Sequence, residues 1–265
     1  MRLKDRVAIL TGGGRGIGKA IAKAFAREGA IVVIAATTFS KLEETVKEIE
    51  EKGGKAKALL MDNRVEEQVV GMVAEVIKAY GQIDILVNNS GIGGPTANVV
   101  DMDLEEWNNV LSIDLTGSML CCREVLKYMI PRRKGIIINI AAEGGRGGDG
   151  RTGYPMRSPY CCAKMGVIGL TETLSIEVGP HNIRVNAISA AAVRGERLER
   201  VVRGRSEATG VPFEELMGQI TKNYSLGRPA EERELASCAV FLASDESSAI
   251  TGQTIVNHCG QHIVN

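Results

Sequence analysis

Short runs of β-branched and aliphatic residues alternate along the chain with segments in which apolar residues recur every three or four positions. The short runs are nearly unbroken, which is typical of strands covered on both faces of a sheet. They predict strands over 7–11, 30–36, 56–61, 83–88, 136–140, 183–188 and 254–257. The periodic segments predict helices from a Gly-rich turn to about 28, over 41–51, from about 69 to 80, and over 104–130, 161–178 and 235–242.

Strict alternation of strand and helix predicts parallel strands joined by right-handed crossovers. The fold class expected is therefore α/β: one Rossmann-like, doubly wound parallel sheet with helices on both faces, spanning 1–265 as a single domain. The stretch 190–229 reads as irregular and is too long for a plain connection. Such a segment is typical of a substrate lid or binding loop.

Composition narrows the class of protein. Of 265 residues, 44% are hydrophobic and only 4% aromatic, so the core must come from Ala, Val, Ile and Leu. Lys plus Arg and Asp plus Glu each number 32, a balance that argues against binding nucleic acid or an acidic membrane surface. We find no apolar run long enough to span a bilayer and no signal-peptide pattern, which predicts a cytoplasmic protein. The six Cys form no CxxC motif, so we expect reduced thiols and no metal site.

A Gly-rich turn follows the first strand and reads Thr11-Gly12-Gly13-Gly14-Arg15-Gly16-Ile17-Gly18. Glycines let the backbone approach a pyrophosphate, and the helix that follows offers free N–H groups and the positive end of its dipole. Between a strand and a helix, this turn predicts a dinucleotide site. The cofactor-binding residues expected here are Gly12, Arg15, Gly16, Ile17 and Gly18.

The TGxxxGxG spacing resembles that of the short-chain dehydrogenase/reductase family. Further motifs match the family in order: Asn88-Asn89-Ser90-Gly91, Tyr160-Cys161-Cys162-Ala163-Lys164, Asn182-Ile183-Arg184-Val185-Asn186 and Ile250-Thr251-Gly252-Gln253. The resemblance covers nearly the whole chain. It implies that Asp62 and Asn63 lie at the adenine, that Asn88 and Gly91 line the cofactor cleft, and that Lys164 holds the nicotinamide ribose.

The choice between NAD(H) and NADP(H) depends on the end of the second strand. Enzymes that use NAD usually carry an acidic residue there for the ribose 2′-hydroxyl. This chain has Ala36, Thr37 and Thr38, with no acid and no directly following base, although Arg15 could reach a 2′-phosphate. We expect NAD(H) slightly ahead of NADP(H), and no bound cofactor if the cleft is degenerate.

The resemblance implies a catalytic tetrad of Asn, Ser, Tyr and Lys. A tyrosine is a weak base at neutral pH, and a nearby ammonium group favours its phenolate form. Tyr160 and Lys164, four residues apart on one helix face, match this pair. Asp114, in Ile113-Asp114-Leu115-Thr116-Gly117, stands in the place of the Asn. Asp is nearly isosteric with Asn, but it lacks the amide donor and adds a charge.

The tetrad Ser is replaced. Ile138-Asn139-Ile140-Ala141-Ala142 puts Ala142 in its place, and counting back from Tyr160 gives Gly147 instead. Thr152 and Ser158 are the nearby hydroxyls, and Ser158 is poorly placed. After the sixth strand, Ser189-Ala190-Ala191-Ala192 replaces the family's Pro-Gly. Changes around one reacting centre, with the fold motifs retained, predict a catalytically impaired subunit.

Basic residues cluster near the expected substrate site. They are Arg194, Arg197, Arg200, Arg203 and Arg205 in the lid segment, and Arg146, Arg151 and Arg157 before Tyr160. Arginine binds carboxylates and phosphates with two hydrogen bonds, so the cluster suits an anionic or acyl-CoA substrate. The alternative, which we favour, is a solvated helix paired with Glu196 and Glu199.

Two helical segments, 104–130 and the one from Tyr160, are apolar on too many faces for a monomer. By resemblance, these helices join a homologous subunit in a homo- or hetero-tetramer. Three hypotheses follow: an impaired subunit of an alcohol or hydroxyacyl-CoA dehydrogenase beside an active paralogue, a self-sufficient oxidoreductase using Tyr160 and Lys164, or an NAD(H)-sensing module. The first resembles the degenerate subunit of a 2-[hydroxy(phenyl)methyl]succinyl-CoA dehydrogenase.

Overall fold

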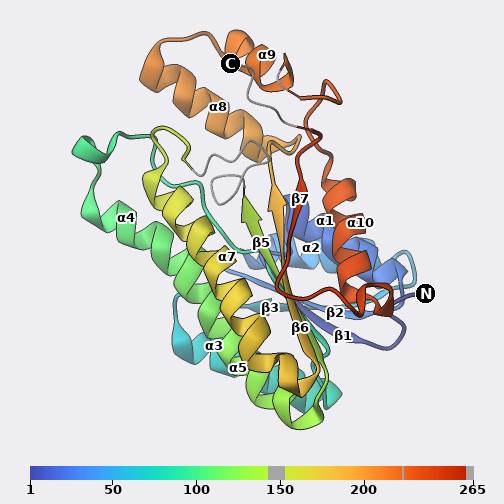
Figure 1. The fold of residues 1–265 in the computed structure, drawn as a ribbon. Helices are drawn as coiled ribbons and strands as arrows, with labels where there is room; N and C mark the ends of the chain where they lie inside the picture. The colour runs from blue at the N-terminus through green and yellow to red at the C-terminus, as the bar shows by residue number, and fades with distance from the viewer. Residues whose placement is uncertain (143–152, 223, 261–265) are drawn as a thin grey trace.

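A computed structural model describes residues 1–142, 153–222 and 224–260. Their strands form one seven-stranded sheet in the order β3-β2-β1-β4-β5-β6-β7, and every pair of neighbours is parallel (Figure 1). The strands are β1 (Val7–Thr11), β2 (Ile31–Ala36), β3 (Lys55–Leu60), β4 (Ile85–Asn88), β5 (Gly135–Ala142), β6 (Ile183–Ala190) and β7 (Thr254–Asn257). The predicted Rossmann-like α/β fold is confirmed.

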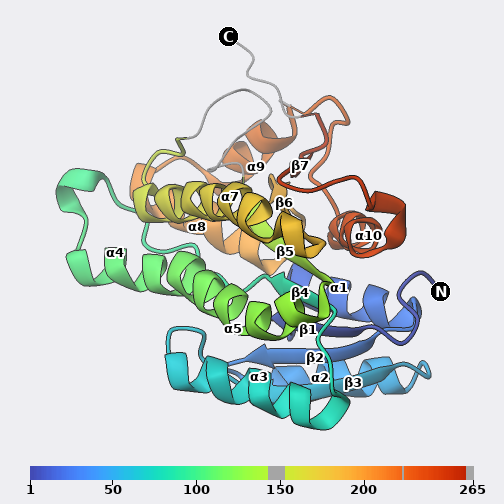
Figure 2. The same cartoon turned by 60° about the horizontal axis from the view of Figure 1, so that its bottom comes forward.

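Helices cover both faces of the sheet (Figure 2). They are α1 (Gly16–Arg27), α2 (Phe39–Glu50), α3 (Glu66–Tyr80), α4 (Leu104–Leu111), α5 (Gly117–Arg132), α7 (Ser158–Val178), α8 (Glu196–Thr209), α9 (Phe213–Lys222) and α10 (Glu232–Ala243). Short 3₁₀ turns occupy Val99–Asp101, Gly179–His181 and Asp245–Ser247.

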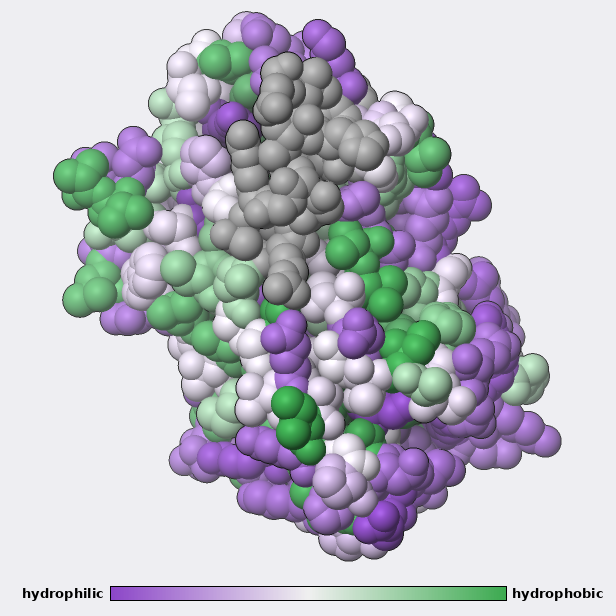
Figure 3. Space-filling view, in the orientation of Figure 1, coloured by the Kyte–Doolittle hydropathy of each residue, from purple (hydrophilic) through white to green (hydrophobic). Residues whose placement is uncertain are grey.

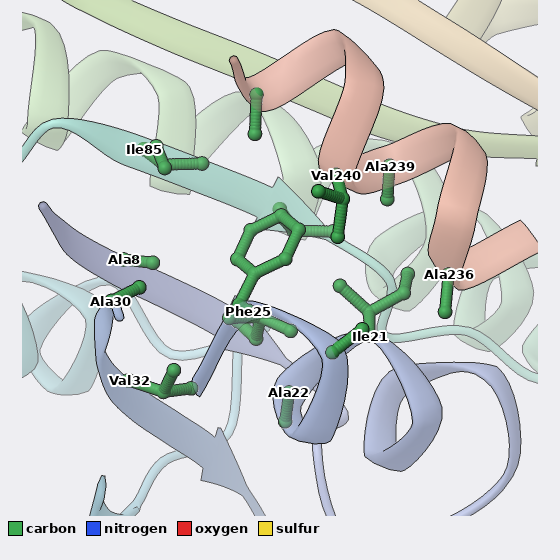
Figure 4. Close-up of a cluster of buried hydrophobic side chains, with 14 of the residues drawn as sticks. Ala8, Ile21, Ala22, Phe25, Ala30, Val32, Ile85, Ala236, Ala239 and Val240 are labelled. Atoms are coloured by element: carbon green, nitrogen blue, oxygen red, sulfur yellow. The ribbon is translucent and has the colours of Figure 1, made fainter. Parts of the chain in front are cut away.

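The core lies in two layers because successive residues of a buried strand point to opposite faces. Ala8 and Leu10 of β1 pack with α1, α2 and α10, whereas Val7 and Ile9 pack with α3 and α5. Phe25 of α1, which is fully buried, lies between the sheet and α10 (Figure 4). The two layers hold the carboxyl ends of β1, β4 and β5 in fixed relation.

The helical stretch expected over 104–130 is present, with a π-turn at Ser112–Thr116 between α4 and α5 that the sequence did not predict. One sequence prediction is wrong. The stretch 190–229, expected to be irregular, contains α8 and α9 beyond the carboxyl ends of β5 and β6 (Figure 1). In α8 the apolar stripe that would mark a helix is nearly absent, since its only fully buried residue is Val202. Its role as a lid stays a prediction.

All six cysteines are unpaired. Burial raises the pKa of the Cys122 thiol to about 12, so this thiol is inert packing rather than a nucleophile. Across the described part of the chain, none of the helices combines the length and the apolar character needed to cross a membrane.

Candidate functional site

The Gly-rich turn between β1 and α1 is a closely packed loop that ends in an open helix N-terminus. Gly12 and Gly16 have φ angles of +68° and +55°, which favour glycine. A Cβ on Gly18 would collide with the carbonyl oxygen of Gly12. No side chain caps α1 at Arg15, so its first amides are free to meet an anion. The loop therefore fits a pyrophosphate.

The segment after β4 is tied to this turn by hydrogen bonds. Thr11 Oγ1 accepts from the backbone amides of Asn89 and Ser90, both at 3.0 Å. Asn89 Nδ2 donates to the carbonyl oxygens of Thr11 and Gly12, both at 3.1 Å. Sequence reasoning missed Thr11 and Asn89 as the pair that shapes the turn, although each directly borders a predicted site residue.

Asn88 and Asn63, two predicted cofactor residues, have side chains that bond within the protein. Asn88 Nδ2 donates to Asn139 Oδ1 at 2.9 Å, deep between strands. Asn63 Nδ2 donates to the carbonyl oxygen of Ile113 at 2.8 Å. Each holds the backbone around the cleft in place.

Asp62 lies half-buried after β3, where its carboxylate pairs with Arg64 at 2.6 Å. The hydrogen bonds from Arg64 hold the pKa of Asp62 below its ordinary value. At the neighbouring end of β2, Thr37 and Thr38 are exposed, and so is Arg15 on the Gly-rich turn. Among the described residues, the end of β2 therefore carries no carboxylate at the position where NAD enzymes usually have one.

The expected reacting centre lies on the first turns of α7, where Tyr160 is half-buried and Lys164 is buried. Lys164 Nζ is 5.8 Å from the centre of the Tyr160 ring. The same ammonium group donates to the carbonyl oxygen of Ile140 in β5 at 3.0 Å. The expected pair is therefore together in space, with its lysine anchored on the sheet.

Asp114 contacts this lysine directly. Its Oδ2 lies 3.2 Å from Lys164 Nζ, an ionic contact rather than a well-directed hydrogen bond. Its Oδ1 accepts from the backbone amide of Ile92 at 2.8 Å, and the side chain is 0% exposed. A Cβ on Gly91 would lie 2.7 Å from Oδ2, so only glycine fits there. Sequence reasoning found Asp114 but not its ion pair.

The π-turn aims this carboxylate inward. A π-turn disrupts the regular bonding of the helix, and here other groups satisfy its carbonyl oxygens. Asn63 donates to Ile113, and the Ser118 hydroxyl donates to the Asp114 carbonyl oxygen at 3.0 Å. Local side chains therefore stabilise the irregular turn that carries Asp114.

Ala142 is the last residue of β5 and pairs with Ala190 of β6. No hydroxyl stands at that position. Ser158 lines a separate groove of about 630 Å³ with Tyr154, Cys162 and Met165, a groove to which Tyr160 does not contribute. Gly147 and Thr152, the other positions considered for the missing donor, lie outside the described residues.

The arginines of the basic cluster fall into two groups, those beside Tyr160 and those with other neighbours. Arg197 lies over the Tyr160 ring at 5.5 Å, and Arg157 is 6% exposed beside it. The other described arginines have neighbours elsewhere: Arg203 over Phe213, Arg205 over Tyr154, Arg194 paired with Glu231, and Arg200 in a surface groove with Glu196 and Glu199. The solvated helix of the favoured alternative agrees with the exposure of Arg197, Arg200 and Arg203, although Glu196 and Glu199 form no ion pair with them among the residues described. Arg146 and Arg151 lie outside the described residues.

Comparisons with known proteins agree over nearly the full chain. A family model described as enoyl-(acyl carrier protein) reductase matches residues 12–262. A 3-oxoacyl-[acyl-carrier-protein] reductase of Thermotoga maritima is 35% identical over 255 residues, covering 96% of this chain and 97% of its own. A meso-2,3-butanediol dehydrogenase of Serratia marcescens is 31% identical over 255 residues, covering 96% and 94%.

Solved structures give the same result. An NAD⁺-bound xylitol dehydrogenase superposes with a TM-score of 0.93 at 30% identity, over 98% of this chain and 100% of its own. An actinorhodin polyketide ketoreductase with NADPH superposes with a TM-score of 0.90 at 32% identity, over 97% and 96%. One of these relatives holds NAD⁺ and the other NADPH.

Proposed function

Because the chain belongs to the short-chain dehydrogenase/reductase family, we propose that it is an NAD(P)-dependent oxidoreductase that interconverts a hydroxyl and a carbonyl group. The observation that carries the proposal is the placement of Tyr160 and Lys164 on one turn of α7, with the lysine anchored on β5. The neighbouring strand β4 leads into the segment that is hydrogen-bonded to the Gly-rich turn. The nicotinamide supplies or accepts the hydride.

The residues of this chain then have distinct tasks. The amides at the start of α1 bind the pyrophosphate, and Gly12 and Gly18 let the backbone come close. Lys164 is placed to hold the nicotinamide ribose. The Tyr160 hydroxyl donates a proton to the substrate oxygen in reduction and takes it in oxidation. Either nicotinamide cofactor fits, and preference for NAD(H) stays a prediction that the exposed Arg15 argues against.

We further propose that turnover by the isolated chain is slow. Asp114 neutralises the charge of Lys164, which would otherwise favour the Tyr160 phenolate. Ala142 supplies no hydrogen bond to the reacting oxygen, and loss of one such donor costs about 10²–10³ in rate. Both features support an impaired subunit that acts beside an active homologue.

Exposed apolar side chains on α5 and α7 support a homologous partner. Ile176 is 78% exposed, and Tyr128 and Met165 are each 36% exposed. Figure 3 shows apolar and weakly polar residues over the middle of this face, with hydrophilic residues along its lower margin. Packing against a second subunit would remove these side chains from water.

The test begins with calorimetric titration of the purified chain with NADH and with NADPH, which needs no substrate. Initial rates follow on a panel of short alcohols, hydroxy acids, ketones and oxo acids, with Tyr160→Phe as the inactive control. We expect micromolar cofactor binding and a slow rate that Tyr160→Phe abolishes. A rate typical of a fully active dehydrogenase would refute the impairment, and absence of binding to either cofactor would refute the oxidoreductase assignment.

A further inference from the structure

A buried arginine beside the reacting tyrosine has only neutral partners among the described residues. Arg157 directly precedes α7 and is 6% exposed. Its Nη1 donates to the carbonyl oxygens of Gly93 and Gly94, at 3.0 and 2.9 Å. No described carboxylate pairs with it. A guanidinium group has five N–H donors, and these two bonds use only one of its nitrogens.

The electrostatic surroundings of Arg157 favour an added negative charge. Burial lowers the pKa of its guanidinium, and the positive charge of Arg197 lowers it further. The charged and titratable groups acting on it are Arg197, the phenols of Tyr154 and Tyr160, and the Cys161 thiol. Arg157 is buried without a described counter-ion whereas Arg197 is exposed, and an anion beside both would compensate the buried charge.

Arg197 approaches from the opposite element. It lies on the first turn of α8, with its guanidinium carbon 5.5 Å from the centre of the Tyr160 ring. The segment that carries Gly93 lies between Arg157 and Val201 of α8, since a Cβ on Gly93 would contact both side chains. Arg197 therefore contacts Tyr160 from α8, and Arg157, three residues before Tyr160, bonds the Gly93 segment that packs against α8.

We propose that Arg157 and Arg197 form a subsite for a carboxylate carried by the substrate close to its reacting carbon. This inference rests on the proposed oxidoreductase function, which places the reacting oxygen at the Tyr160 hydroxyl. Because Arg197 lies over that same ring, an anion held there is only a few bonds from the reacting carbon. The phosphates of a coenzyme A ester are a whole pantetheine arm away from its carbonyl, so they are excluded as this anion.

The chemistry of the two side chains suits this ligand. A planar guanidinium matches the two oxygens of a carboxylate and stays charged in a partly buried site. The expected substrates are therefore short hydroxy acids and the corresponding oxo acids, rather than neutral alcohols such as butanediol.

The test measures binding, so it is independent of turnover. Pyruvate, acetoacetate and levulinate, each with its methyl ester, are titrated by calorimetry into the intact chain, with and without saturating NADH. Dihydroxyacetone phosphate is titrated in the same way, to compare a phosphate group with the carboxylates. The variants are Arg197→Met on the surface and Arg157→Met in the buried position. If Arg157→Met does not fold, Arg157→Lys replaces it, since lysine keeps the positive charge. Arg200→Met, on the next turn of α8, is the matched control.

We expect at least one oxo acid to bind ten times more tightly than its ester or more. Arg197→Met and Arg157→Met should reduce that ratio to threefold or less, and Arg200→Met should preserve it. Equal binding of acids and esters, or a ratio unchanged in both variants, would overturn the subsite. Tighter binding of the phosphate ester with the same sensitivity would replace carboxylate by phosphate. Acid binding without any cofactor binding would refute the oxidoreductase function and leave the subsite standing.

Discussion

Replacing Asp114 by Asn tests the interpretation of the reacting centre. Lys164 Nζ is 5.8 Å from the Tyr160 ring centre, which gives about 3 kcal/mol of attraction for a phenolate at an effective dielectric constant of about 20. Asp114 Oδ2 is 3.2 Å from that nitrogen, hence within about 9 Å of the ring, and repels the phenolate by about 2 kcal/mol. The carboxylate therefore cancels more than half of the lysine's effect.

Asp114→Asn keeps an acceptor for the Ile92 amide and removes the charge. We expect alcohol oxidation at neutral pH to become at least about tenfold faster, because a factor of ten corresponds to about 1.4 kcal/mol and the repulsion removed is about 2 kcal/mol. NADH should also bind more tightly, since Lys164 becomes free to reach the ribose. The measurements are initial rates and a calorimetric titration, the second of which needs no substrate.

Stability provides the control. Loss of one partner of a buried ion pair costs about 3–5 kcal/mol, and we expect about 3 kcal/mol here because Lys164 keeps its bond to Ile140. Asp84, 3% exposed and 2.9 Å from Arg132, forms an ion pair at the opposite, amino-terminal end of the strands, directly before β4. Asp84→Asn should lower the urea-unfolding free energy comparably without changing the oxidation rate. An unchanged rate together with unchanged NADH affinity in Asp114→Asn would refute the reasoning.

Three further changes have defined outcomes. Gly18→Ala should abolish NADH binding in calorimetry, because the added Cβ would meet Gly12. Gly71→Ala, at an open position on α3, should preserve the affinity. Equal affinities in the two variants would disprove the role of the Gly-rich turn in binding the cofactor. Arg15→Ala should weaken NADPH at least tenfold more than NADH, and equal weakening would remove its role at the 2′-phosphate. The Arg228 pair lowers the Glu234 pKa from 4.5 to about 2, so its stabilisation is present above pH 4.5 and lost as the pH falls toward 2. Urea unfolding should show Glu234→Gln less stable by under about 1 kcal/mol at neutral pH, with no difference near pH 2; a gap that persists in acid would contradict this.

The sheet could be predicted because its strands are covered on both faces and leave unbroken apolar runs. The helix α8 could not, since one buried residue, Val202, gives no periodic signal. The π-turn also escaped prediction, because its one extra residue shifts the apolar stripe by one position, and a segment that is apolar on several faces hides such a shift.

At the site, motif spacing identified Tyr160, Lys164 and Asp114. Their chemistry depends on contacts between segments far apart in sequence, and spacing along the chain carries no information about those. The contact of Asp114 with Lys164 and the approach of Arg197 to Tyr160 are of this kind. The hydrogen bonds of Asn89 were missed for the same reason, because they depend on how the β4 loop meets the Gly-rich turn.

The π-turn at Ser112–Thr116 links the number of residues in this helical segment to the position of the Asp114 carboxylate. Its wider turn takes up one extra residue, so the helices before and after it keep their buried faces toward the core. Deleting one residue there would restore regular winding and leave α5 facing the sheet, but the Asp114 carboxylate would lose the wide turn that directs it toward Lys164. A one-residue deletion at this point would therefore change the reacting centre and leave the core packed, whereas the same deletion within α5 would rotate all that follows by about 100°.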